Sequence, residues 1–244
     1  MHEVDSVYGD FQTEKQAFEQ AFKYMKYYFP DKQTPDIYTF ISEFSLQKFL
    51  FETDVNQEGL ALGLDMFLGA DYPYAQFIPN NPAFSSYLIR RFNKEHLVKR
   101  SMGALVEDII GGNQGSNLLE KMIHNGKKLY ILDQLLPYTP DSIIIEYTQA
   151  QMEWVEDNEV EMWAYLLKED LFYESDINTI NKLVNPSPNS PGMPKEAPGR
   201  TANYLGWKVV AEFMKRQPNY DLIKLINERD AQKILNLSKF KPRK

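Results

Sequence analysis

The run Gly59–Leu68 constrains the fold of this chain more than any other segment. It is almost entirely apolar, and Asp65 is its one charged residue. An apolar run without polar alternation is typical of a strand that is covered on both faces. Two alternating segments precede it, Asp36–Glu43 and Gln47–Thr53, and both fit neighbouring strands. The sequence therefore predicts a small mixed sheet in the N-terminal half, with Gly59–Leu68 at its centre.

Helical periodicity dominates the rest of the chain, because apolar residues recur three and four positions apart. Thr13 and Asn219 are candidate N-caps, and Thr148 with Gln151 matches a capping box. The expected elements are Thr13–Phe29, Asn93–Ile110, Ser116–Leu136, Asp141–Tyr147, a helix from Thr148, Asn158–Leu171, a short Asp176–Val184, Ala202–Arg216, a helix after Asn219 and Asp230–Leu237. The predicted fold class is α+β and mainly helical, as a single domain over residues 1–244 in which helices pack the sheet.

Three segments are predicted to be loops. Tyr72–Pro82 is rich in Pro and Asn, and Asn185–Gly199 holds five prolines, a composition typical of an extended, surface-exposed segment. We favour a long loop within one domain over a domain boundary, because the helix after Gly199 is too apolar to stand alone. The glycine-rich Gly111–Gly115 follows a helix and lacks the lysine of a phosphate-binding loop, so a plain loop is favoured there as well.

The composition of the chain excludes several classes of protein function. The net charge of −7 argues against a nucleic-acid binder, and the absence of cysteine excludes disulfides and thiolate metal sites. No stretch approaches the roughly 20 apolar residues of a membrane span. Met1–Asp5 does not look like a signal peptide, which taken alone favours the cytoplasm. The basic residues near the C-terminus, Lys239, Lys241, Arg243 and Lys244, are expected to form a solvated tail.

Four blocks of this sequence carry a resemblance to a known family. They are Leu60–Tyr74, Gly126–Asp133, Tyr147–Gln151 followed by Trp154, and Gly199–Met214. Together they resemble the gliding-motility lipoprotein GldB family of Bacteroidota cell envelopes, in order and over almost the whole chain. The resemblance implies a lipid-anchored protein of the periplasm or outer membrane that is needed for gliding motility and linked to type IX secretion.

The same resemblance implies partners among other envelope proteins of the gliding and secretion machinery. It implies no nucleic-acid partner, and it implies membrane association only through a lipid anchor. The N-terminal lipidation segment of the family is not seen in this sequence. We therefore expect an envelope protein, although no signal peptide is visible.

The order of strands before helices also resembles zincin-like metallopeptidases. Their His-Glu-x-x-His motif needs two imidazoles four residues apart, and His2, His96 and His124 offer no such pair. In the matching register Val106 and Ile110 replace both ligands, Glu107 survives, and Asn125 falls near the third ligand position. We interpret the chain as a zincin-like architecture without the metal motif and expect no metal, cofactor or catalytic residue. The alternative is that Glu107 is an ordinary exposed glutamate and the likeness is only one of fold.

The candidate binding residues lie in two of the resembling blocks. Asp65 ends an apolar run, where a lone carboxylate needs a partner, and Arg200, Lys127 or Tyr204 are candidates. The other candidates are Tyr72, Tyr74, Asn203, Tyr204 and Trp207. Packing is the alternative for each of them, and Gly206 is expected to let another backbone approach closely. His124 and Lys127 are expected at the surface.

These observations favour a non-catalytic envelope protein that acts through protein contacts. Its contact surfaces are expected in the aromatic-rich loop Tyr72–Phe84 and in the Pro-rich loop Asn185–Gly199, since loops carry such contacts more often than regular elements do. The alternative is a metal-independent peptidase or glycan hydrolase with a site near Asp65, Glu107 and Asn203. A third possibility is a glycan or peptide binder that uses exposed Tyr and Trp side chains.

Overall fold

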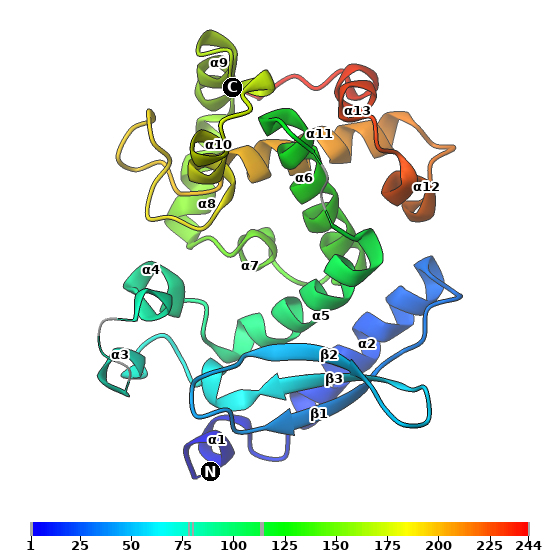
Figure 1. The fold of residues 1–244 in the computed structure, drawn as a ribbon, viewed down its shortest axis with the longest axis vertical. Coiled ribbons are helices and arrows are strands. Elements are labelled where there is room, and N and C mark those ends of the chain that lie inside the picture. Colours follow the sequence, from blue (N-terminus) through cyan, green and yellow to red (C-terminus); the bar gives the residue numbers. More distant parts are fainter. Residues whose placement is uncertain (1, 78, 80, 113–114, 244) are drawn as a thin grey trace. The chain divides into compact units, whose positions relative to one another are not determined.

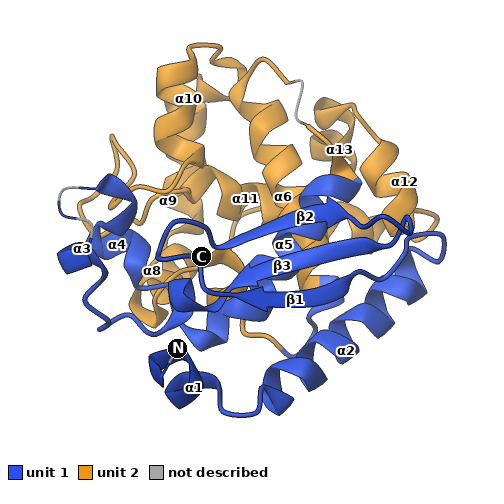
Figure 2. Ribbon diagram, turned by 60° about the horizontal axis from the view of Figure 1, so that its bottom comes forward, with its two compact units in different colours: residues 1–109, 134–138 blue, residues 110–133, 139–244 orange. Residues whose placement is uncertain are grey.

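The computed structural model describes residues 2–77, 79, 81–112 and 115–243. Helices dominate, and a three-stranded sheet lies in the N-terminal half, so the predicted α+β, mainly helical class is confirmed (Figure 1). The chain divides into two compact units (Figure 2). Unit 1 comprises residues 1–109 and 134–138, and unit 2 comprises residues 110–133 and 139–244. A single domain over residues 1–244 stays a prediction beside this division.

The sheet of unit 1 has the strand order β1-β3-β2. β1 (Asp36–Phe40) runs parallel to the central β3 (Glu58–Gly63), and β2 (Lys48–Glu52) runs antiparallel to it. The sheet is therefore mixed, and the apolar run is central, as predicted. The run does not stay extended, however. Leu64–Phe67 forms a 3-10 turn, η1, so the predicted strand to Leu68 is too long.

The two faces of the sheet are built differently. On the inner face, Leu60 of β3 lies between Ile37 of β1 and Leu50 of β2, and Leu62 lies between Thr39 and Lys48. Phe18 and Phe22 of α2 (Gln12–Tyr28) share a hollow with the inner-face residue Ile37. α2 therefore packs this face, behind the sheet in Figure 1.

On the outer face, aromatic rings from the edge strands lie over small residues of β3. Tyr38 and Phe49 flank Ala61, Phe40 lies beside Gly63, and Phe51 lies beside Gly59. A Cβ atom added at Gly59 would run into the Phe51 ring. The rings contact one another as Tyr38–Phe51 at 5.2 Å and Phe40–Phe49 at 5.8 Å between centroids. β3 is thus covered on this face by side chains of its own sheet.

Among the described residues of unit 1 there are four further α-helices, of which α5 continues to Ile110 in unit 2. They are α1 (His2–Tyr8), α3 (Tyr74–Phe77), α4 (Ser86–Ile89) and α5 (Lys94–Ile110). α1 was not predicted, and its Tyr8 hydroxyl donates to the Phe67 carbonyl at 3.0 Å. Thr13 is not the N-cap of α2, because Phe11 holds that position in a left-handed conformation. The helix predicted at Asn93–Ile110 is confirmed.

Unit 2 is helical in the part that the structure describes. Its helices are α6 (Leu118–Leu135, whose last two residues fall in unit 1), α7 (Asp141–Ile145), α8 (Gln149–Asp157), α9 (Glu159–Lys168), α10 (Ile177–Val184), α11 (Thr201–Arg216), α12 (Leu222–Asn227) and α13 (Ala231–Ser238). The capping box of Thr148 and Gln151 is confirmed. Asp221, rather than Asn219, caps α12. None of the helices described in either unit is long and apolar enough to cross a membrane.

The Pro-rich loop and the C-terminal segment, which were both expected at the surface, are each anchored to the fold. In the Pro-rich loop, the buried Ser190 hydroxyl bonds to the Pro198 carbonyl and lies 2.8 Å from the Thr201 hydroxyl. Near the C-terminus, the Phe240 ring packs on Trp163, and the Arg243 amide donates to Glu159 at 2.9 Å. Most side chains of the loop before Ala197, and the basic side chains Lys239, Lys241 and Arg243, are exposed as predicted, and the anchoring contacts are what the sequence did not indicate.

α6 and α11 approach each other at two glycines. A Cβ atom at Gly126 would collide with the backbone of Gly206, and one at Gly206 would collide with the Met122 carbonyl. The predicted close approach of another backbone at Gly206 is therefore confirmed. Beside the crossing, the Asn125 amide donates to the Asn203 side-chain oxygen at 2.9 Å. Backbone contact and this hydrogen bond together fix the register of the two helices.

Replacing Gly126 with Ala should destabilise the protein by about 2 kcal/mol or more, because the added methyl group meets rigid backbone. The measurement is thermal or denaturant unfolding. Gly103→Ala in α5 is the matched control, since nothing lies within 4 Å of the added atom. There the better helix propensity of Ala should raise stability by up to about 1 kcal/mol. Equal effects of the two substitutions would contradict the close approach.

Candidate functional site

The Asp65 carboxylate is buried and organises the loop between β1 and β2. It accepts hydrogen bonds from the Ser42 amide at 3.0 Å, from the Ser42 hydroxyl at 2.9 Å and from the Phe44 amide at 2.8 Å. The proposed partners Arg200, Lys127 and Tyr204 were therefore wrong. A buried carboxylate is satisfied here by local donors, mainly of the backbone.

The loop that Asp65 holds is strained. Glu43 and Phe44 both have positive φ, 55° and 59°, which is unfavourable for residues other than glycine. This conformation places the Phe44 ring against Tyr72, at 5.7 Å between centroids, and against Phe77, at 4.9 Å. Tyr72 and Phe77 stack nearly parallel at 5.9 Å. We call Phe44, Tyr72 and Phe77 the aromatic cluster.

Tyr72 and Tyr74, both predicted binding residues, have different environments. Tyr72 is half-buried, and its hydroxyl donates to the Glu3 carboxylate at 2.8 Å. Burial, then the hydrogen bond to Glu3, raises its pKa to about 12. Tyr74 has no exposed surface, and its hydroxyl accepts from the Leu68 amide at 2.7 Å. Tyr72 is therefore accessible to a partner, and Tyr74 packs in the core.

The candidates at the start of α11 are all buried. The Asn203 amide donates to the Val184 carbonyl at 2.8 Å, and its oxygen accepts from Asn125. The Tyr204 hydroxyl donates to Glu159 at 2.8 Å, and burial followed by this bond raises its pKa. Trp207 is 3% exposed. These side chains join α11 to its neighbours, and none presents an open polar group to solvent.

The positions expected to correspond to a lost metal motif differ in their exposure to solvent. Val106 is fully buried, Glu107 is exposed as its alternative interpretation required, and Ile110 is half-buried. Asn125 is the partner of Asn203. Within residues 2–77, 79, 81–112 and 115–243, no three His, Asp or Glu side chains gather closely enough to hold a metal ion.

The outer face of the sheet is the most extended aromatic surface that the sequence analysis missed. Tyr38 is 45% exposed and Phe49 is 42% exposed. A sequence signal for it exists. Aromatic residues stand two apart in both edge strands, and the central strand carries small residues at Gly59, Ala61 and Gly63. Period-2 alternation places all of them on one face.

These features define a class, that of mainly helical α+β proteins with a small mixed sheet that exposes aromatic rings on one face. The family model described as gliding motility protein GldB matches residues 1–242. The chain therefore belongs to the GldB gliding motility protein family, as its resemblance implied. Neither the curated proteins nor the solved structures contain a significant match.

Replacing Asp65 with Asn should destabilise the protein by about 2 kcal/mol, because one buried oxygen becomes a donor that faces the donors of Ser42 and Phe44. Denaturant unfolding measures the loss. Asp71→Asn is the control, since Asp71 is exposed and lies in the same region of the chain. An Asp65 variant as stable as the Asp71 variant would show that this carboxylate does not hold the loop.

Proposed function

We propose that this protein is a non-catalytic component of the gliding machinery that works by binding other proteins of the cell envelope. Family membership supports a role in gliding motility. The observation that carries the binding proposal is the aromatic outer face of the sheet. Lipid anchoring in the envelope and a link to type IX secretion belong to the same proposal.

The outer face has the properties of a protein contact surface. Its four rings, Tyr38, Phe40, Phe49 and Phe51, come from two edge strands and lie over one central strand. Aromatic side chains are enriched at protein interfaces, because each buries a large area and loses little conformational entropy. Single exposed apolar residues are normal, but a contiguous patch of rings marks an interaction site.

The aromatic cluster provides a second apolar surface in the same unit. Phe77 is 53% exposed, and Phe44 lies on the loop that directly follows the outer-face residue Phe40. The hydrogen bonds to Asp65 stabilise the strained conformation of Glu43 and Phe44. Strained backbone of this kind persists where the surroundings enforce it, and it is enriched at functional sites. The contact surface proposed around Tyr72–Phe84 thus centres on Tyr72 and Phe77.

The environments of two proposed catalytic residues favour the non-catalytic proposal over a hydrolase. The Asp65 oxygens are taken up by Ser42 and Phe44, and the Asn203 side chain is bonded through both its oxygen and its nitrogen. A general base must reach the proton of a substrate or of a water molecule. Side chains that are bonded in this way act as structural supports.

The outer face is tested by the double variant Tyr38→Ser and Phe49→Ser, expressed in a gliding bacterium that lacks its own copy. Both rings are exposed by more than two-fifths, so the fold should persist while spreading motility is lost. Tyr27→Ser is the matched control, because Tyr27 is 77% exposed on α2, away from the outer face. It should leave motility unchanged.

Circular dichroism and protein levels establish that both variants are folded. Wild-type motility of a folded double variant would refute the assignment of the outer face. Phe77→Ser and a separate substitution of the exposed Lys195 and Glu196 then test the two loops. Ser190 is kept in the loop variant, because it is buried and anchors the loop.

A further inference from the structure

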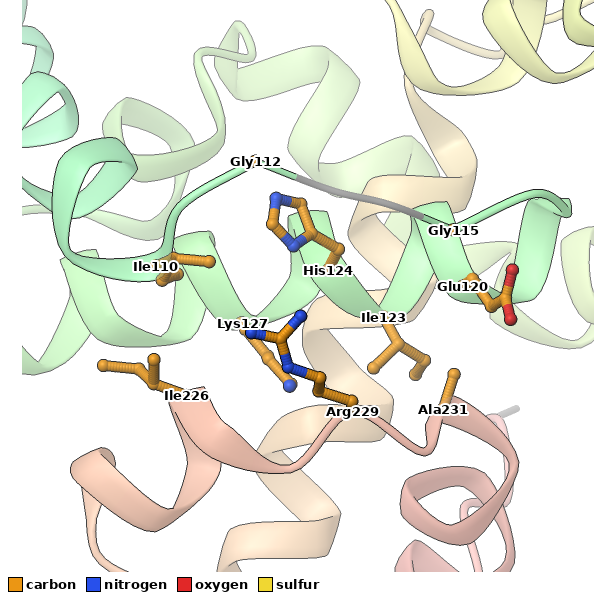
Figure 3. A pocket seen from close by; sticks show the side chains of 10 residues that line it. All are labelled: Ile110, Gly112, Gly115, Glu120, Ile123, His124, Lys127, Ile226, Arg229 and Ala231. Atoms are coloured by element: carbon orange, nitrogen blue, oxygen red, sulfur yellow. The ribbon is translucent and has the colours of Figure 1, made fainter.

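Unit 2 contains a hollow of about 220 Å³ between α6 and the segment that joins α12 to α13. All three of His124, Lys127 and Arg229 line this hollow; in Figure 3 the Lys127 and Arg229 side chains lie next to each other, and the His124 ring lies on the side of Gly112. Ile110, Ile123 and Ile226 form apolar parts of the wall. Residues 113 and 114, part of the glycine-rich loop predicted from sequence, lie outside the described residues.

Lys127 is buried, so its predicted surface position was wrong. Its ammonium group donates to the Glu228 carbonyl and has two further N–H donors. Burial lowers the pKa of Lys127 to about 8. The charge of Arg229 lowers this pKa further, and the charge of Glu228 raises it. Lys127 is therefore mostly cationic at neutral pH, although burial of its ammonium group disfavours the charged form.

His124 experiences the same positive surroundings. Burial, followed by the charges of Lys128, Lys127 and Lys121, lowers its pKa to about 4. At neutral pH its ring is uncharged and offers one N–H donor. The hollow thus combines two cations with one neutral donor.

The acids near the hollow are already hydrogen-bonded. Glu120 accepts from the Ser116 amide at 2.6 Å and from the Asn117 amide at 3.2 Å, next to the start of α6. Glu228 accepts from the Tyr220 hydroxyl at 3.0 Å and from Lys233. In the part of the chain that the structure describes, neither acid forms a salt bridge with Lys127 or Arg229. Glu228 still acts on Lys127 through its charge, and Glu120 lines the hollow, but the carboxylates of both acids already accept other hydrogen bonds.

From this arrangement we propose that the hollow binds a small oxyanion, a phosphate group, between Lys127 and Arg229. A guanidinium fork matches two phosphate oxygens, and an ammonium group adds a point charge. A water molecule occupies about 30 Å³ in the liquid, so the hollow has room for an anionic group. The hollow lies in unit 2, whereas the proposed aromatic contact face belongs to unit 1.

The test uses sulfate, because it remains a dianion over the pH range in which His124 titrates. The full chain has three histidines, so NMR can follow each ring. A dianion between Lys127 and Arg229 favours the protonated imidazole, so the pKa of His124 should rise by about one unit or more. Chloride at equal ionic strength controls for screening. The exposed His2 should not move beyond this control.

Arg229→Gln removes an exposed side chain and should abolish the sulfate-induced shift of His124 without unfolding the protein. Lys121→Gln is the matched control, because it removes one charge from the same helix but does not line the hollow. Its sulfate response should remain. An unchanged pKa of His124 in sulfate, or an equal response in the Arg229 variant, would overturn the proposal.

Two further arms identify the source of the phosphate group. One adds inorganic phosphate and glycerol phosphate in solution, and the other measures sedimentation with phosphatidylglycerol vesicles against phosphatidylcholine vesicles. Arg229-dependent sedimentation identifies a lipid headgroup. A response of His124 to the soluble phosphates with no Arg229-dependent sedimentation identifies a free ligand. A response in neither arm would overturn the assignment to phosphate.

Discussion

The backbone contact between α6 and α11 at Gly126 and Gly206 is the constraint on which unit 2 depends. No side chain separates the two helices there, so neither helix can move along the other without a collision of main-chain atoms. The polar pair of Asn125 and Asn203 lies directly beside the contact. Since the residues of a helix keep fixed spacing, the crossing also determines where His124 and Lys127 point. The α6 side of the hollow therefore depends on glycine at positions 126 and 206, where no side chain fits.

Unit 1 relies on a different device. Its central strand carries glycine and alanine on one face and leucine on the other, so the outer face is closed by the rings of the edge strands instead of by a helix. Asp65, in the 3-10 turn that follows the strand, holds the loop between β1 and β2 in a conformation that is otherwise unfavourable. The segment Gly59–Leu68, which includes Asp65, thus supports both aromatic surfaces of unit 1. The strand lies under the rings of the outer face, and Asp65 holds the loop that carries Phe44.

The sequence predicted what depends on periodicity. The central strand, the helix of α5, the capping box and the close approach at Gly206 were all recovered, because each has a repeating or local signature. The 3-10 turn after Gly63 was missed because an apolar run looks the same in a strand and in a buried turn. The partners of Asp65 were missed because backbone amides leave no mark in a side-chain pattern. Lys127 looked exposed because burial by the segment near Glu228 is a contact across about a hundred residues. The outer face had a legible signature of alternating aromatic and small residues that was overlooked.

The two walls of the hollow differ in what holds them. The α6 wall is locked by main-chain contact, which side-chain motion cannot relax. The opposite wall is a three-residue link, residues 228–230, between two short helices, and the hydrogen bonds of the Glu228 side chain hold it in place. An entering anion would therefore reorganise only one side of its site, and most of the entropic cost of ordering would fall on that link. One wall of the site is therefore fixed before an anion binds, and the other wall is the part that can adjust to it.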